Sequence, residues 1–196
     1  HAAALLRRSV ALACEARDDA VARGGRRERF VAASIGPYGA FLHDGSEYRG
    51  NYGLTRQQLI DWHRPRFEIL ADSGADLFAL ETIPCLVEAE ALVELLADFP
   101  GVRAWLSVSC KDERNLCHGE PLTRIVELTN ASPNIIAVGV NCTPPRYIDG
   151  LLDSVNARAR KPLLVYPNRG EAWNSARGEW QSPGDLVDDA AWAEAA

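Results

Sequence analysis

The chain has 196 residues, of which 47% are hydrophobic, so it contains enough apolar material for one full-sized core or a large part of a bigger one. This composition excludes a disordered or fibrous chain, and no apolar run approaches the about 18 residues that cross a bilayer. A net charge of −6, with scattered basic residues, argues against a nucleic-acid or acidic-membrane partner. The five cysteines are irregularly spaced, so we expect reduced thiols in a soluble cytoplasmic protein.

The sequence alternates between helical patterns and short apolar runs. A helix is predicted over 5–21, ahead of the first apolar run. The runs are four to six residues long and rich in Val, Ile, Leu and Phe, which is typical of strands buried on both faces of a sheet. In chain order these predicted strands are 30–35, 77–80, 104–108, 135–140 and 163–166.

Helix start signals lie between the predicted strands. Thr55 and Gln58 have the spacing of a capping box, and Pro65 predicts a kink or a break in the helix that they begin. Thr143, followed by Pro144, has the order of a cap and a first-turn proline, which predicts another helix start.

The predicted strands start 27 to 47 residues apart, which is the rhythm of repeated strand, helix and parallel strand units. Such units form either a doubly wound open sheet or a closed (β/α)8 barrel. No Gly-rich phosphate loop follows any strand, so the barrel is favoured. Five units cannot close a barrel and the chain has no methionine, so we expect 1–196 to be a single, incomplete domain of a longer polypeptide. Residues 36–54 fill the longest gap and, being rich in Gly and Tyr, predict a loop.

Polar residues at the carboxyl ends of the predicted strands form the candidate site, because that edge carries the active site in both architectures. They are Ser34, Gly36, Tyr38, Glu81, Thr82, Ser107, Ser109, Cys110, Lys111, Asn141, Cys142, Tyr166, Asn168 and Arg169. A carboxylate that leaves a buried strand, as at Glu81, needs a cation or several donors. Glu81 could therefore recognise an ammonium group, transfer a proton or form a structural ion pair with an arginine.

Cys142 ends a predicted strand just before a helix start, where backbone N–H groups favour a thiolate. It could be a nucleophile, a metal ligand or a small buried hydrophobe. A zinc cluster with Cys110, Cys117 and His118 matches no structural zinc spacing. Lys111, after another strand, could form a Schiff base or be a solvated loop residue.

Several short segments at these strand ends occur together and in a fixed order. They read GPYGA at 36–40, DGSEYRG at 44–50, HRPR at 63–66, Glu81-Thr82, GVNC at 139–142 and YPNRGE at 166–171. In this combination the chain resembles the homocysteine S-methyltransferases, in particular the branch that uses S-methylmethionine as methyl donor. The resemblance runs from about Phe30 to Trp180.

The resemblance implies a (β/α)8 barrel that holds one Zn²⁺ through three cysteine thiolates, of which Cys142 matches the first. Glu81 matches the glutamate that holds the amino group of homocysteine, whose sulfur is the fourth zinc ligand. The implied reaction moves a methyl group from a sulfonium donor, S-methylmethionine or S-adenosylmethionine, to homocysteine and gives methionine. Zinc would deprotonate the thiol, and the surrounding thiolates would keep it nucleophilic.

The family's other two zinc cysteines belong to a Gly-Gly-Cys-Cys motif on the last strand, which this sequence does not contain. The chain then corresponds to strands three to seven, with strands one, two and eight expected outside it. Asn141 is expected beside the substrate as an orienting group rather than a metal ligand. Asn168 and Glu171 are expected to face the substrate from a long loop over 166–183 at the barrel mouth.

Two other interpretations remain open from the sequence. One is an aldolase or lyase on the same barrel that forms a Schiff base at Lys111. The other is a non-catalytic barrel that binds an amino acid or a partner protein and has lost the metal.

Overall fold

A five-stranded parallel sheet forms the centre of the protein in the computed structural model, which describes residues 1–24, 28–168, 172–174, 177 and 179–181. The strands are β1 (Ala32–Ile35), β2 (Leu77–Ile83), β3 (Ala104–Val108), β4 (Ile135–Asn141) and β5 (Leu163–Tyr166). They pair in the order β1-β2-β3-β4-β5, so each strand lies beside its neighbours in the sequence. A doubly wound sheet reverses its order at a switch point, whereas this one does not. The sheet is therefore an arc of a (β/α)8 barrel, as predicted.

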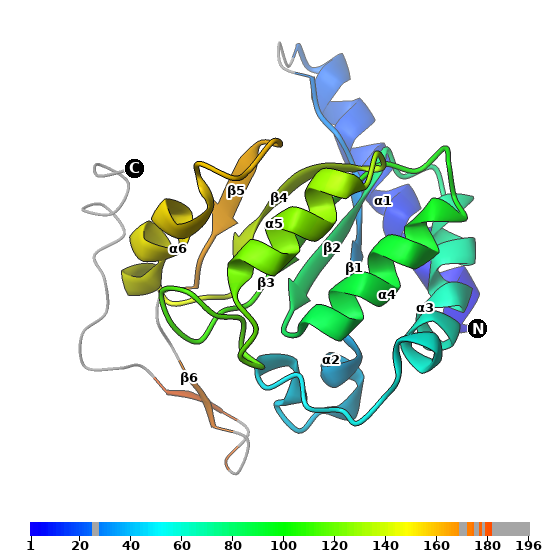
Figure 1. Ribbon diagram of the computed structural model, residues 1–196. Helices are drawn as coiled ribbons and strands as arrows, with labels where there is room; N and C mark the ends of the chain where they lie inside the picture. The colour runs from blue at the N-terminus through cyan, green and yellow to red at the C-terminus, as the bar shows by residue number, and fades with distance from the viewer. Residues whose placement is uncertain (25–27, 169–171, 175–176, 178, 182–196) are drawn as a thin grey trace.

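Helices connect the strands, and α4 and α5 lie across the face of the sheet that is turned toward the viewer in Figure 1. The longer helices are α1 (Ala2–Ala22), α3 (Arg56–Ala71), α4 (Leu86–Ala97), α5 (Leu122–Ala131) and α6 (Ile148–Val155). Phe67 of α3 and Phe78 of β2 are both buried and meet edge to face, with 5.3 Å between ring centroids. Such contacts join the helices to the sheet. Within the described residues, no helix combines the length and apolarity that a membrane span requires.

The two predicted helix starts differ in outcome. Thr55 and Gln58 form both halves of a capping box at the start of α3, which confirms the first. The helix continues through Pro65, so the predicted break does not occur. Pro65 is exposed, and water can satisfy the backbone carbonyl that loses its partner there.

Thr143 does not cap a helix. Its hydroxyl donates to the carbonyl of Asn141 at 3.0 Å and accepts from the backbone N–H of Cys110 at 2.9 Å. The side chain thus ties the end of β4 to the segment after β3. The chain then forms a short 3-10 helix, η2 (Pro145–Tyr147), before α6 begins.

The predicted loop over 36–54 contains two short helices, α2 (Tyr38–Leu42) and η1 (Ser46–Tyr48). Figure 1 shows α2 beyond the arrowheads of the central strands, at their carboxyl ends. Gly39 is required there, because a Cβ at this position would lie 2.3 Å from the backbone nitrogen of Glu47. Ser109, just after β3, donates to the carbonyl of Glu47 at 3.5 Å. The loop is therefore held against the edge of the sheet where the candidate residues lie.

Candidate active site

Glu81 lies near the carboxyl end of β2 and is partly buried. Each of its carboxylate oxygens accepts one hydroxyl hydrogen bond: Oε1 from Ser34 at 2.5 Å and Oε2 from Tyr166 at 2.9 Å. Within the described residues, no arginine or lysine forms an ion pair with it. The structural ion pair that the sequence left open is therefore absent from this part of the chain. Glu81 presents a carboxylate held by hydroxyl groups, which is suited to a cationic ligand.

Cys142 follows β4 directly, is partly exposed and forms no disulfide. Its sulfur lies 3.3 Å from Asn141 Nδ2 and 3.6 Å from the hydroxyl of Thr82, and both groups donate to it. The backbone N–H of Cys142 donates to the carbonyl of Tyr166 at 3.3 Å. The Cys142 sulfur is therefore held by two hydrogen-bond donors, one on its own strand end and one on β2.

Asn141 is buried and connects the ends of β2 and β4. Its Oδ1 accepts from the backbone N–H of Thr82 at 2.9 Å, and its Nδ2 donates to the Thr82 hydroxyl at 2.8 Å. Strand alternation alone would send the side chains of Asn141 and Cys142 in opposite directions. Cys142 has a φ of +48°, so the chain has already turned and the two side chains meet. Asn141 therefore orients Thr82 and Cys142, while its place beside the substrate stays a prediction.

Thr82 and Cys142 share an uncommon backbone conformation. Their φ values are +63° and +48°, in the left-handed region that side chains other than glycine rarely adopt. Such strain persists only where the surroundings fix it, and the bidentate contact of Asn141 with Thr82 provides that support. Neither position is a glycine, so no residue type in the sequence marks this conformation.

Tyr48, at the end of η1, is a neighbour of Cys142 that the strand-end reasoning did not include. Burial raises the pKa of Tyr48 to about 12, and electrostatic interactions with Cys142, Glu47 and Cys117 add to this shift. The phenol of Tyr48 is therefore neutral and lies within electrostatic reach of the Cys142 sulfur. Tyr48 reaches this place through the fold of the loop over 36–54, and the positions of strand ends in the sequence do not reveal the contacts of that loop.

The described residues do not support the zinc cluster that the sequence left open. Among the described residues, no three His, Cys, Asp or Glu side chains gather as a metal site, so Cys110, Cys117 and His118 do not form a cluster with Cys142. Cys110 is buried, and burial raises its pKa, which keeps it a thiol. Lys111 is exposed in the loop after β3, as the solvated alternative for it predicts.

The segment after β5 is described only in part. Asn168 is partly buried and lies two residues beyond the strand, whereas Glu171 lies outside the described residues. The predicted loop over 166–183 contains an antiparallel pair, β6 (Ala172–Asn174) and β7 (Glu179–Gln181). The facing of Asn168 and Glu171 toward the substrate stays a prediction.

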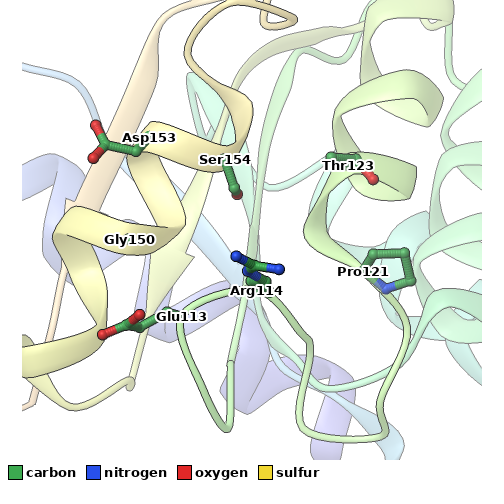
Figure 2. A pocket seen from close by; sticks show the side chains of 7 residues that line it. All are labelled: Glu113, Arg114, Pro121, Thr123, Gly150, Asp153 and Ser154. Carbon is green, nitrogen blue, oxygen red and sulfur yellow. The ribbon is translucent and has the colours of Figure 1, made fainter.

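A surface cavity of about 520 Å³ lies between α6 and the residues that lead into α5. Figure 2 shows the Arg114 side chain between Ser154 on one side and Pro121 and Thr123 on the other. Glu113 also lines it, against Gly150, where a Cβ would come within 2.7 Å of the Glu113 Cβ. None of the residues predicted for the site lines this cavity, so it is separate from the site at the strand ends.

Comparison with known proteins identifies the family. A family model described as Homocysteine S-methyltransferase matches residues 1–195. The chain is 44% identical over 180 residues to Homocysteine S-methyltransferase YbgG of Bacillus subtilis (strain 168), covering 90% of this chain and 57% of that protein. It is 46% identical over 191 residues to Selenocysteine Se-methyltransferase of Brassica oleracea var. italica, covering 90% and 54%. The chain thus spans a little over half the length of these relatives.

Solved structures of a homocysteine methyltransferase also match the chain. The metallated form of the homocysteine methyltransferase MmuM from Escherichia coli superposes with a TM-score of 0.82 at 43% identity, covering 86% of this chain and 59% of that one. The apo form of the same enzyme gives a TM-score of 0.76 at 37% identity. With a family model that matches nearly its whole length and with relatives above 40% identity, the chain belongs to the homocysteine S-methyltransferase family.

Proposed function

We propose that the protein is a zinc-dependent methyltransferase that moves a methyl group from a sulfonium donor to the thiol of homocysteine, giving methionine. The proposal depends on one observation: the adjacent residues Glu81 and Thr82 join the two parts of one site, a carboxylate and the sulfur of Cys142. Glu81 offers a carboxylate to an ammonium group, and the Thr82 hydroxyl donates to the Cys142 sulfur. Homocysteine carries an amino group and a sulfur close together, which matches the placement of the Glu81 carboxylate and the Cys142 sulfur.

Cys142 fits a role as a metal ligand. Its sulfur lies at the carboxyl end of β4, is partly exposed and is oriented by two hydrogen bonds, and cysteine sulfur is a preferred zinc ligand. The described residues contain no complete group of three metal-ligating side chains, so further ligands would come from outside them. When bound, zinc would supply acidity that deprotonates the substrate thiol at neutral pH.

The residues of this chain then position the reactants. Glu81 binds the amino group of homocysteine, and Asn141 and Thr82 hold Cys142 in its turned conformation. In the transfer, a bond forms between the homocysteine sulfur and the methyl carbon, and the bond from that carbon to the donor sulfur breaks. The donor leaves as a neutral thioether, so no residue is needed to protonate a leaving group. S-methylmethionine and S-adenosylmethionine both satisfy this chemistry.

The test uses deuterated homocysteine, because S-methylmethionine itself becomes methionine when it donates. The natural protein is incubated with either sulfonium donor, and deuterated methionine is measured by mass spectrometry. Metal analysis of the same preparation should give about one zinc per chain. Absence of deuterated methionine with both donors, in a preparation that carries zinc, would refute the proposed reaction.

A further inference from the structure

We propose that Tyr166 is a positioning residue that aims the Glu81 carboxylate at the substrate amino group, and that it thereby sets the preference for amino-acid thiols over thiols without an amino group. This inference rests on the proposed function. Tyr166 ends β5, whereas Glu81 is on β2, so β3 and β4 lie between them in the sheet. The phenol oxygen nevertheless lies 2.9 Å from Glu81 Oε2.

The hydrogen bonds at the phenol oxygen determine where its proton points. Trp105 Nε1 lies 3.0 Å from this oxygen and can only donate, and the Ser107 hydroxyl lies 2.5 Å from it. With Trp105 and Ser107 donating to its two lone pairs, the single proton of Tyr166 is directed to Glu81. The opposite direction would require Glu81 to carry a proton, and a neutral carboxyl group could not pair with an ammonium group.

The support for Tyr166 is built into the sheet. Trp105 and Ser107 are two residues apart on β3, so their side chains lie on the same face of the sheet, toward Tyr166. Ser107 is fully buried, and burial raises the pKa of Tyr166, so its phenol keeps the proton that it donates. The side chain is therefore fixed by two donors before any ligand arrives.

Tyr166 acts on one half of the substrate only. Ser34 holds Glu81 Oε1 and Tyr166 holds Oε2, so the carboxylate cannot rotate without losing a hydrogen bond. The remaining lone pairs are left in a fixed direction for an ammonium group. Among the described residues, the phenol makes no hydrogen bond to the Cys142 sulfur, and the Tyr166 carbonyl bonds only the Cys142 backbone. Loss of the hydroxyl should therefore weaken binding of the amino group and leave the chemical step intact.

The experiment compares Tyr166→Phe with Tyr147→Phe, a matched control whose hydroxyl accepts from Arg146 at 3.1 Å outside the site. Each variant is assayed with homocysteine and with 4-mercaptobutanoate, which is homocysteine without its amino group. We expect Tyr166→Phe to raise the KM for homocysteine about tenfold or more, the effect of losing a hydrogen bond to a charged group, with kcat within about twofold. With 4-mercaptobutanoate, Tyr166→Phe and the unmodified protein should have equal kcat/KM.

Two further variants connect the effect to Glu81. Ser107→Ala, which removes one donor to the phenol, should raise the KM for homocysteine by a smaller factor. Adding Tyr166→Phe to Glu81→Gln should change kcat/KM by less than about twofold, because the two residues act on the same group. An unchanged KM in Tyr166→Phe, or equal losses with both thiols, would overturn the role of Tyr166 while leaving the proposed function standing. If the unmodified protein methylates neither thiol, both the proposed function and this inference are wrong.

Discussion

The hydroxyl of Thr82 lies 3.6 Å from the sulfur of Cys142, and both residues have a left-handed backbone. The side-chain amide of Asn141 holds this pair together through the backbone N–H and the hydroxyl of Thr82. Two strained turns on non-adjacent strands are thus fixed by one buried side chain. The geometry of a metal or substrate at Cys142 therefore depends on this contact.

Asn141→Ala should destabilise the fold and weaken metal binding together. The Thr82 N–H loses its buried acceptor, which costs about 1–3 kcal/mol in the free energy of unfolding. Loss of a group that orients a ligand lowers metal affinity about 10- to 100-fold. Urea unfolding and chelator competition measure the two effects. Asn134→Ala is the matched control, because Asn134 bonds the carbonyl of Leu96 at 3.2 Å, before β4 begins. Equal loss of metal affinity in both variants would contradict the prediction.

Cys142→Ala should abolish zinc retention and methyl transfer while the protein still folds. The physical reason is that the described residues hold no group of three His, Cys, Asp or Glu side chains that could bind zinc in its place. Cys85→Ala is the control: burial raises the pKa of Cys85 to about 12, so that side chain stays a thiol. It should lower the melting temperature and leave the zinc content unchanged. Zinc content and circular dichroism of both variants decide the matter, and an active Cys142→Ala protein would exclude this residue as a ligand.

Glu81→Gln should raise the KM for homocysteine, because the variant keeps the shape of the side chain and removes its charge. If the ammonium and carboxylate pair is desolvated, the penalty is about 2–5 kcal/mol in kcat/KM. Glu94→Gln provides the comparison, since Glu94 forms an exposed ion pair with Arg56 at 3.1 Å and should have no effect on KM. Steady-state kinetics with varied homocysteine give the result. A normal KM in Glu81→Gln would mean that Glu81 does not bind the amino group.

The fold and most strand ends could be predicted from the sequence, because both follow from local patterns. The runs 104–108 and 163–166 match β3 and β5 residue for residue, and Cys142 directly follows β4, whereas β2 continues past the predicted end and Glu81 lies two residues before its last residue. The links between strands could not be predicted. The contact of Trp105 with Tyr166 depends on which residues of distant strands face each other, and periodicity within one strand does not contain that information.

For the same reason, the sequence did not predict a buried polar cluster that contacts the loop over 36–54. His63 of α3 and Glu88 of α4 are fully buried, with Nε2 of His63 2.9 Å from Oε1 of Glu88. Arg66 lies 2.8 Å from Nδ1 of His63, and the backbone N–H of Tyr38 donates to the same Glu88 oxygen at 2.6 Å. A guanidinium group can only donate, so Nδ1 is the acceptor and Nε2 carries the proton. His63 is therefore neutral, and the cluster fixes the start of the loop.

This geometry predicts a loss of stability in mild acid. Burial lowers the pKa of His63 in the folded protein, and nearby Arg66 lowers it further, against the opposing effect of Glu88. The unfolded chain takes up a proton near about pH 6.5, where the folded His63 does not, so stability is complete above that pH and falls as the pH drops toward the lowered value. Uptake of one proton on unfolding gives a slope of up to about 1.4 kcal/mol in the free energy of unfolding for each pH unit. Urea unfolding between about pH 7.5 and 5 should show this slope reduced in His63→Gln and unchanged in His43→Gln, whose side chain is exposed. An unchanged slope in His63→Gln would assign the acid sensitivity to other groups.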